Sequence, residues 1–556
     1  MRQLFSEYSK EKWEEVRHSD YYRPAVEAIT KKAERYLASD PAPLKYRDYE
    51  LYYRNGNRSI YGGAVSQYDD RLSVFAFMYM LTEEDKYLSA LSDAIWWECD
   101  MESWTPPAHM SEDYPPERRE TCIDLCSSIM GSRIAEILAL VGDKLPKLVR
   151  RRAEYEVRKR VIDSFHKYDD FPWIRRTNNW ASVCAGSVGL TYLYMASDEE
   201  IEKELPRLLE TMRLFLTGFD KQGCCYEGYA YWKYGFSFYV IFAKALYEYS
   251  KCKIDLFDNE KVHAIAKFQE NMAMNDRECV SFSDCDQDFT QDIWLSHVLK
   301  KRYPDIEIPP VGDGVRSGCA VLHTILLQDP ALANEKMTGK NFYYEEAQWF
   351  IHKNKNYNFA AKAGSNNESH NHNDVGSFLI SKNGKVTFTD PGREEYNGAT
   401  FGPKRYEVPV YSSYGHSVPL INGKTQKAGT GYAKVTEVSE HVFAFDFEGN
   451  YDIPELSRLN RRFECGENEL KIIDTYEFND MPDSICERFS TYIKPEVTDG
   501  CVKVGDSVLS YDPEQFSAEV TTYEVYQSAS RRPTLYFIEL RAKAPKKNFS
   551  CAFTIS

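Results

Sequence analysis

The 556-residue sequence lacks the features expected of a nucleic-acid, membrane or secreted protein. Its net charge is −16, whereas a general nucleic-acid binder needs a basic surface. No apolar run is long enough to cross a bilayer. The start, MRQLFSEYSKEKWEEV, has no basic segment followed by an apolar one, so we expect no signal peptide. The 14 cysteines form neither a disulfide framework nor a CxxC pair, which favours free thiols in a reducing, cytoplasmic compartment.

What the chain has in quantity is aromatic residues, which make up 14% of it and include 40 tyrosines. Tyr and Trp stack on sugar rings, but they also fill large helical cores, so the count leaves both interpretations open. An acidic ligand would need local positive charge in this acidic chain. Three basic pairs are candidates for it: Arg118-Arg119, Arg175-Arg176 and Lys404-Arg405.

The first 330 residues carry apolar side chains at the i, i+3, i+4 and i+7 spacing of packed helices. Short polar or Pro/Gly breaks separate these stretches. Repeated helix pairs of this kind close into an α/α toroid or stack into a solenoid, and the lack of a fixed-period repeat argues against the solenoid. The clearest helical stretches are 71–97, 122–145, 180–196, 202–219 and 234–250.

The pattern changes near residue 340 to alternating segments rich in β-branched and aromatic residues. In LISKNGKVTFTD, the pair Asn383-Gly384 separates two strand-like runs and predicts a hairpin. Many such strands predict an antiparallel β-sandwich. With 556 residues exceeding one ordinary core, we expect two domains, a helical toroid over residues 1–340 and a sandwich over 341–556.

Polar residues gather first at Arg175-Arg176-Thr177-Asn178-Asn179-Trp180, before an apolar helical run. An ordinary helix N-cap explains one of the amides. Two amides beside two arginines and a tryptophan also suit a sugar carboxylate, so we expect Asn178, Asn179 and Trp180 to contact substrate.

Four tyrosines and a tryptophan follow within nine residues in YEGYAYWKY (226–234). Each phenol seeks a hydrogen-bond partner, so a core is a poor place for so many. We expect a loop that lines a pocket, with Glu227, Tyr229 and Tyr231 facing the substrate.

The most specific cluster is His370-Asn-His372-Asn-Asp374, with Asp390-Pro-Gly and His416 downstream. If this segment is a strand, residues i and i+2 point to one face and both imidazoles share a surface. His372, Asp390 and His416 together form a His/Asp/His set that suits zinc without any cysteine. A polar network without metal is the alternative.

Through these motifs the sequence resembles the heparinase II/III-like family of polysaccharide lyases, and the resemblance extends over nearly its whole length. The resemblance is most specific in Asn178-Asn179, YEGYAYWKYG (226–235) and HNHNDVGSFLI (370–380) with Asp390-Pro-Gly. It implies an incomplete α/α toroid followed by an antiparallel β-sandwich, with the cleft between them.

The resemblance also implies roles for individual residues. Asn179 matches the asparagine that neutralises the uronate carboxylate, Tyr231 the catalytic tyrosine, with Tyr229 as a competitor, and His370 the catalytic histidine. His372, Asp390 and His416 match the structural zinc ligands of some members. No organic cofactor is implied. Several members carry a histidine where this chain has Trp180, a departure that points to a different sugar stereochemistry or subsite.

The implied reaction is β-elimination at a uronate, which removes the C5 proton and expels the O4-linked sugar. The negative charge of the enolate that forms must be stabilised by hydrogen-bond donors, as in an oxyanion hole. A base must reach the C5 proton and an acid must reach O4. C5 stereochemistry decides whether Tyr231 or His370 is the base, and both assignments stay open. The expected partner is an acidic oligosaccharide or polysaccharide, glycosaminoglycan- or alginate-like, and a homodimer is allowed for.

Two other functions compete. A glycoside hydrolase on a similar toroid would pair Glu227 with Asp124 or Asp286, because hydrolysis needs two carboxyl groups at one bond. A catalytically inactive glycan-binding relative is the second. An unsaturated uronate product would distinguish the lyase from both.

Overall fold

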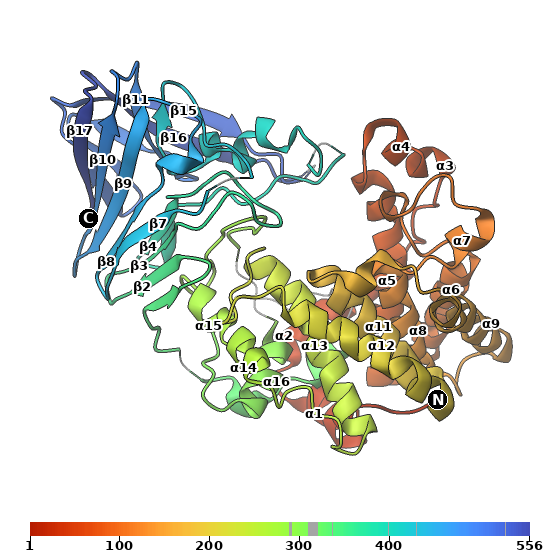
Figure 1. Cartoon of the computed structure of the whole chain (residues 1–556). Helices are drawn as coiled ribbons and strands as arrows, with labels where there is room; N and C mark the ends of the chain where they lie inside the picture. Colours follow the sequence, from red (N-terminus) through yellow and green to blue (C-terminus); the bar gives the residue numbers. More distant parts are fainter. Residues whose placement is uncertain (289–291, 310–320, 336, 399, 430, 529) are drawn as a thin grey trace.

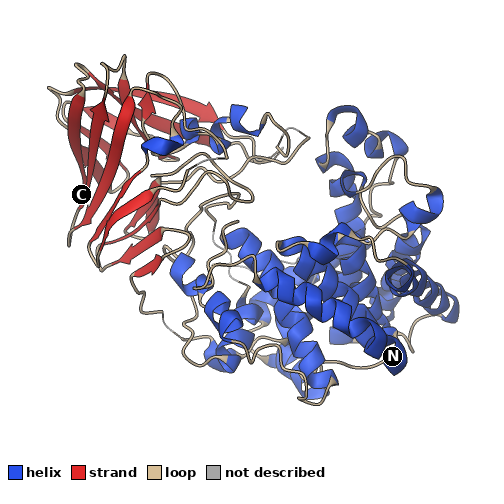
Figure 2. Cartoon of the chain, in the orientation of Figure 1, coloured by secondary structure: helices blue, strands red, loops and turns tan. Residues whose placement is uncertain are grey.

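The computed structural model describes residues 1–288, 292–309, 321–335, 337–398, 400–429, 431–528 and 530–556. Its helices gather in one body and its strands in another (Figure 2). In Figure 1 the chain runs from the helical body, in red to green, into the sheets, in green to blue. The predicted order of a helical half followed by an antiparallel sheet-rich half is confirmed.

The α-helices have the following bounds: α1 Lys10–His18, α2 Arg23–Leu37, α3 Tyr46–Tyr49, α4 Leu51–Asn55, α5 Ser59–Thr82, α6 Asp85–Asp100, α7 Pro116–Glu120, α8 Leu125–Val141, α9 Lys147–Val157, α10 Asp163–Lys167, α11 Asn179–Met195, α12 Asp198–Leu216, α13 Tyr229–Tyr249, α14 Glu260–Ala266, α15 Phe268–Met272, α16 Ile293–Arg302 and α17 Val321–Leu326. Each predicted helical stretch falls on these elements. The stretch 71–97 is two helices rather than one, because Glu83 takes a left-handed conformation with φ +58° between α5 and α6.

The long helices form two layers. In the inner layer α5 packs beside α8, α8 beside α11, and α11 beside α13, while α6, α9 and α12 cover them from outside. The inner helices are apolar nearly all round, as expected for elements buried on several faces. This paired arrangement is the α/α toroid that the sequence predicts.

Two glycines set the distance between α11 and α13. A Cβ on Gly186 would lie 2.7 Å from the carbonyl oxygen of Phe238, and one on Gly189 would lie 2.3 Å from the Phe242 ring. The absence of side chains therefore lets the two helices approach closely. Their N-terminal ends, which begin at Asn179 and Tyr229, are brought together at the same side of the toroid.

The β-strands have the following bounds: β1 Phe342–Tyr344, β2 Trp349–Lys353, β3 Tyr357–Lys362, β4 Phe378–Lys382, β5 Lys385–Phe388, β6 Leu420–Ile421, β7 Lys434–Val438, β8 Val442–Asp446, β9 Leu456–Cys465, β10 Leu470–Phe478, β11 Ile485–Thr491, β12 Glu496–Thr498, β13 Cys501–Val504, β14 Ser507–Ser510, β15 Phe516–Glu524, β16 Thr534–Ala542 and β17 Asn548–Ile555. They pair antiparallel in three sheets, ordered β1-β2-β3-β4-β5, β12-β13-β14-β17-β10-β9-β8-β7 and β15-β16-β11-β6. Lys382 pairs with Lys385 across Asn383-Gly384, which confirms the predicted hairpin.

Within the sheet-rich half, the five-stranded sheet lies between the helical body and the larger sheet, and residues on both of its faces are buried. Trp349, Ile351 and Leu379 join the helical core, whereas the alternate residues Phe350 and Phe378 join the core of the larger sheet. The first strand begins at Phe342, close to the expected division at residue 340. Because the helical core extends into this sheet, the two halves share packing and are not independent bodies.

Among the described helices, none is both long and apolar enough to cross a membrane. The thirteen cysteines in the described residues are all free thiols.

Candidate active site

A cavity of about 610 Å³ lies where the helical half meets the sheet-rich half. Both halves contribute to its walls, as expected for a cleft between the two domains. Its lining residues are Tyr52, Arg58, Ala108, His109, Leu125, Arg176, Asn178, Asn179, Trp180, Ala230, Tyr231, Tyr234, Asp284, His370, Arg393, Tyr396 and Phe401.

The Asn-Asn-Trp segment reaches this cavity at the start of α11. Asn178 is the N-cap of the helix, and its side chain accepts a hydrogen bond from the backbone N–H of Trp180 at 3.3 Å. Asn179 is buried and lines the cavity, and no described residue hydrogen-bonds its side-chain amide. Asn178 therefore serves the helix, whereas the Asn179 amide remains available to a ligand.

The tyrosine-rich segment is helical, so the expected loop is wrong. Gly228, with φ +88°, ends the preceding loop and α13 begins at Tyr229. Tyr231 lines the cavity, whereas Tyr229 is buried in the core and stacks on Trp232 with ring centroids 5.4 Å apart. The structure thus separates the two candidate tyrosines and places only Tyr231 at the cavity.

His370 faces Tyr231 across the junction of the two halves. Their rings stack with centroids 4.1 Å apart and an angle of 27° between planes. The segment 369–376 is not a strand, contrary to expectation, and His370 has a left-handed φ of +56°. A non-glycine residue held in this region stores strain, which is common where a side chain is aimed for function.

One carboxylate, that of Asp284, holds both histidines of the HNH motif. Its Oδ2 lies 2.6 Å from Nδ1 of His370, and its Oδ1 lies 2.9 Å from Nε2 of His372. The phenol of Tyr396 donates to Oδ2 at 2.9 Å, and Arg405 donates to Oδ1 at 2.7 Å. Burial opposes ionisation of Asp284, yet these partners together hold its pKa well below the usual range. Asp284 is therefore a buried anion that fixes four side chains.

A hydrogen-bond chain links Tyr231 to this anion. The hydroxyls of Tyr231 and Tyr396 lie 2.7 Å apart, and Tyr396 donates its own proton to Asp284. The Tyr231 hydroxyl is consequently the donor to Tyr396. Burial raises the pKa of Tyr231 above its ordinary value and does the same for Tyr396. Both phenols are therefore neutral near neutral pH.

Glu227 lies behind the cavity wall rather than on it. It is buried, accepts a hydrogen bond from Ser369 at 2.7 Å, and is 3.8 Å from Nε2 of His370. The backbone N–H of Asn179 also donates to it. Burial raises the pKa of the Glu227 carboxyl. Glu227 thus connects the start of α11 with the His370 segment and contributes to a smaller adjoining pocket with Tyr231.

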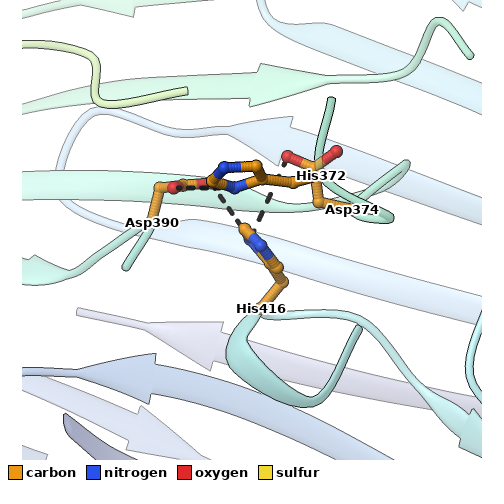
Figure 3. A group of neighbouring side chains, drawn as sticks. All are labelled: His372, Asp374, Asp390 and His416. Carbon is orange, nitrogen blue, oxygen red and sulfur yellow. Dashed lines mark ion pairs between the residues drawn. The ribbon is translucent and has the colours of Figure 1, made fainter. Parts of the chain in front are cut away.

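The three predicted metal ligands converge in the sheet-rich half, joined by a fourth residue (Figure 3). His372, Asp374, Asp390 and His416 are all buried and offer ligand atoms within 4.8 Å of one another. Asp374 is the member that sequence reasoning did not include. It also pairs with the Lys362 ammonium at 2.7 Å.

The hydrogen bonds around this cluster fit a bound cation. His416 donates from Nε2 to the Val410 carbonyl at 3.0 Å, and Nε2 of His372 faces Asp284, so each Nδ1 lone pair points into the cluster. Within the described residues neither Nδ1, nor Oδ2 of Asp390, makes a hydrogen bond of normal geometry. Burial lowers the pKa of His372, which favours its neutral form. His416 is also buried, but the carboxylate of Asp390, 3.0 Å from its Nδ1, raises its pKa. Imidazoles with second partners on Nε2, beside carboxylates, are the donor set of zinc sites.

Two of the three predicted basic pairs place an arginine at the cavity wall or directly behind it. Of the three predicted basic pairs, Arg405 reaches Asp284 and Arg176 lines the cavity with its guanidinium 5.0 Å from the Trp180 ring. Arg118 and Arg119 instead pair with the outer carboxylates Asp170 and Glu102.

Sequence reasoning missed several residues of the site: Arg58, His109, Asp284, Arg393 and Tyr396. Asp284, Arg393 and Tyr396 had a signal available, because they lie in two polar stretches, SFSDCDQD and PGREEYNG, close to motifs already noted. Arg58 and His109 had none.

The carboxylates of the hydrolase alternative do not meet in the cavity. Asp124 is the N-cap of α8 and lies 2.7 Å from His109, while Asp286 lies 3.4 Å from Arg393. Among the described lining residues, the only carboxylate is Asp284, which is committed to four hydrogen bonds.

Comparisons with known proteins agree with this description. Residues 336–472 match the family model described as Heparinase II/III-like, C-terminal. Among solved structures the fold resembles a heparinase III, with 13% identity and a TM-score of 0.64 over 95% of this chain and 83% of that chain. It also resembles heparan sulfate lyase HepC from Pedobacter heparinus, with 11% identity and a TM-score of 0.59 over 98% of this chain and 90% of the other. A comparison with curated proteins finds no match.

The chain therefore has the toroid-plus-sandwich fold of these lyases. The match of segment 336–472 to the heparinase II/III-like C-terminal model confirms the resemblance predicted from the sequence.

Proposed function

We propose that this protein is a lyase that cleaves uronate-containing glycans by β-elimination and leaves a 4,5-unsaturated uronate end. One observation carries the proposal: Tyr231 and His370, from different halves of the chain, stack 4.1 Å apart on the wall of one cavity. A protonated phenol and a histidine side by side can carry out both proton transfers of an elimination, the removal of the C5 proton and the protonation of O4.

Asn179 has the role of binding the uronate carboxylate. The side-chain amide of Asn179 lies at the cavity and has no hydrogen-bond partner among the described residues, although the residue is buried. A preorganised amide beside a carboxylate stabilises the negative charge that spreads onto it when C5 loses its proton. In water the same hydrogen bond would be weaker, so burial contributes to the effect.

His370 acts as the base and Tyr231 as the acid. Nδ1 of His370 donates to the Asp284 anion, which leaves the Nε2 lone pair to accept the C5 proton. The raised pKa of Tyr231 keeps its phenol protonated, so it gives that proton to O4 as the C4–O4 bond breaks and the C4–C5 double bond forms. The adjacent imidazolium then returns a proton to the phenolate, and both groups regain their starting forms.

A zinc ion held by His372, Asp390 and His416, with Asp374 beside them, would have a structural role. The cluster is fully buried and separated from the cavity by Asp284. When bound, the ion would supply a fixed positive centre that holds these segments together. Its effect on the reaction would pass through Asp284, which bridges His372 to His370.

A panel of uronate-containing oligosaccharides tests the function. A lyase produces new ultraviolet absorbance from the unsaturated uronate, whereas a hydrolase releases reducing ends without it and a binding protein does neither. Binding without absorbance on every member of a panel of glycosaminoglycan- and alginate-type substrates would contradict the proposal.

A further inference from the structure

Arg58 lines the cavity without a carboxylate to neutralise it. It lies between α4 and α5 in the helical half, half-buried, and forms no ion pair with any described residue. The chain as a whole carries 85 acidic and 69 basic side chains, so an unpaired arginine in a cavity is not explained by a shortage of partners.

The imidazole of His109 holds the Arg58 guanidinium in place. Nη2 of Arg58 lies 2.8 Å from Nε2 of His109, and Nδ1 of His109 lies 2.7 Å from Asp124. Asp124 accepts the proton on Nδ1, which leaves Nε2 as the acceptor for Arg58. Thr105 and the backbone of Ser127 donate to Asp124 and fix it in turn. The chain Asp124–His109–Arg58 therefore orients the guanidinium without placing a carboxylate in direct contact with it.

The sheet-rich half covers Arg58 from the other side. The guanidinium lies 5.8 Å from the ring centroid of Phe401, and a Cβ on Gly56 would lie 2.7 Å from the backbone nitrogen of Gly398. The two halves therefore touch beside Arg58. Partial enclosure lowers the local dielectric constant, which strengthens the attraction between a guanidinium and an anion.

A second cation continues the same wall. The rings of His109 and Trp180 pack with centroids 4.8 Å apart. The Arg176 guanidinium lies 5.0 Å from the centroid of the same Trp180 ring. No described carboxylate pairs with Arg176 either. The wall thus presents an aromatic surface suited to a sugar ring, flanked by two unpaired guanidinium groups.

We infer that Arg58, positioned by His109, binds a second anionic group of the substrate, a sulfate ester or carboxylate on the sugar next to the cleaved uronate. This inference rests on the proposed function for the nature of the substrate. It goes beyond it because Asn179 takes the carboxylate at the cleavage point, whereas Arg58 selects substrates by charge on the neighbouring sugar. A guanidinium suits both oxyanions because its paired N–H groups match their oxygens.

Three matched oligosaccharides test this selection by calorimetric binding and by steady-state turnover. All carry the same uronate at the cleavage point, and the neighbouring sugar is neutral, sulfated or a second uronate. We expect wild type to bind at least one anionic form about 10- to 100-fold more tightly than the neutral form. The form that gains affinity identifies the anion as sulfate or carboxylate.

Variants then assign the preference to Arg58. Arg58→Ala should remove it, mainly through KM with kcat little changed, and Arg58→Lys should restore part of it. His109→Gln, which can still offer an acceptor to Arg58, should retain more of the preference than His109→Leu. Arg54→Ala is the matched control, because Arg54 is exposed and pairs with Glu50.

Two results overturn the inference: no preference for either anionic form in wild type, or an undiminished preference in Arg58→Ala. Binding is measured separately from cleavage, so the two proposals fail separately. Charge-dependent binding without an unsaturated product would contradict the lyase activity and support the anion site at Arg58. An unsaturated product without charge dependence would do the reverse.

Discussion

Nδ1 of His370 lies 2.6 Å from Oδ2 of Asp284, so a carboxylate of the helical half orients a histidine of the sheet-rich half. Eighty-six positions separate the two residues in sequence. The same carboxylate holds His372 of the metal cluster through its other oxygen. The catalytic pair and the metal cluster are therefore joined through one side chain.

Removing the charge of Asp284 should disable the site. In Asp284→Asn, the amide offers one oxygen and an N–H₂ group to four donors, so His370 and Tyr396 lose their fixed positions. We expect kcat to fall about 10- to 100-fold or more, the range for partners that orient reactive groups. Asp288→Asn, an exposed carboxylate nearby that pairs with Arg531, is the control and should keep wild-type turnover. Unchanged kcat in Asp284→Asn would show that Asp284 does not position the catalytic groups.

The acid role of Tyr231 predicts the result of deleting one oxygen. Tyr231→Phe keeps the ring that stacks on His370 but has no proton for O4, so turnover should fall about 10²- to 10⁴-fold with substrate binding retained. Tyr229→Phe is the control, since that ring is packed in the core away from the cavity. The ultraviolet absorbance of the product measures turnover, and circular dichroism checks that each variant is folded. A reversed result, with only Tyr229→Phe inactive, would transfer the role to Tyr229.

The pH dependence distinguishes an acid from a base at Tyr231. Burial raises the pKa of Tyr231, so the phenol stays protonated beyond the ordinary tyrosine value of about 10. If Tyr231 is the acid, kcat should show no loss from its ionisation between pH 8 and about 10. A base would need the phenolate, and kcat would then rise tenfold per pH unit through this range. Such a rise would assign the base to Tyr231.

Loss of one cluster ligand should affect metal content before chemistry. We expect His416→Ala to be purified with little zinc and a lower Tm, because binding to the folded state stabilises it. A strong chelator should lower the Tm of wild type and leave that of the variant unchanged. His441→Ala, an exposed histidine of the same half, should bind as much zinc as wild type. Full zinc content in His416→Ala would contradict the ligand assignment.

The architecture could be predicted because it depends on local patterns. Apolar periodicity located the helices, alternation located the strands, and Asn383-Gly384 marked its hairpin. The tyrosine-rich segment was misassigned because phenols were expected to avoid a core. In α13 they divide by face instead, with Tyr229 and Trp232 packed inside and Tyr231 at the cavity.

The motif residues of the site were also predictable, but the side chains that connect them were not. Asp284 gains its role only when folding brings it to His370, and Arg58 only when it reaches His109, 51 positions away. Neither contact leaves a periodic or spaced signature. The assumption of a strand at His370 and His372 failed for the same reason, because a shared partner and not a shared strand face brings the two imidazoles together.

The mass balance of cleavage distinguishes elimination from hydrolysis. β-Elimination splits a uronate oligosaccharide into two products whose masses sum to that of the substrate, and one of them absorbs in the ultraviolet. We predict these two products for wild type and far slower formation of both by Tyr231→Phe. Products that together exceed the substrate by one water molecule, without absorbance, would show hydrolysis and contradict this prediction.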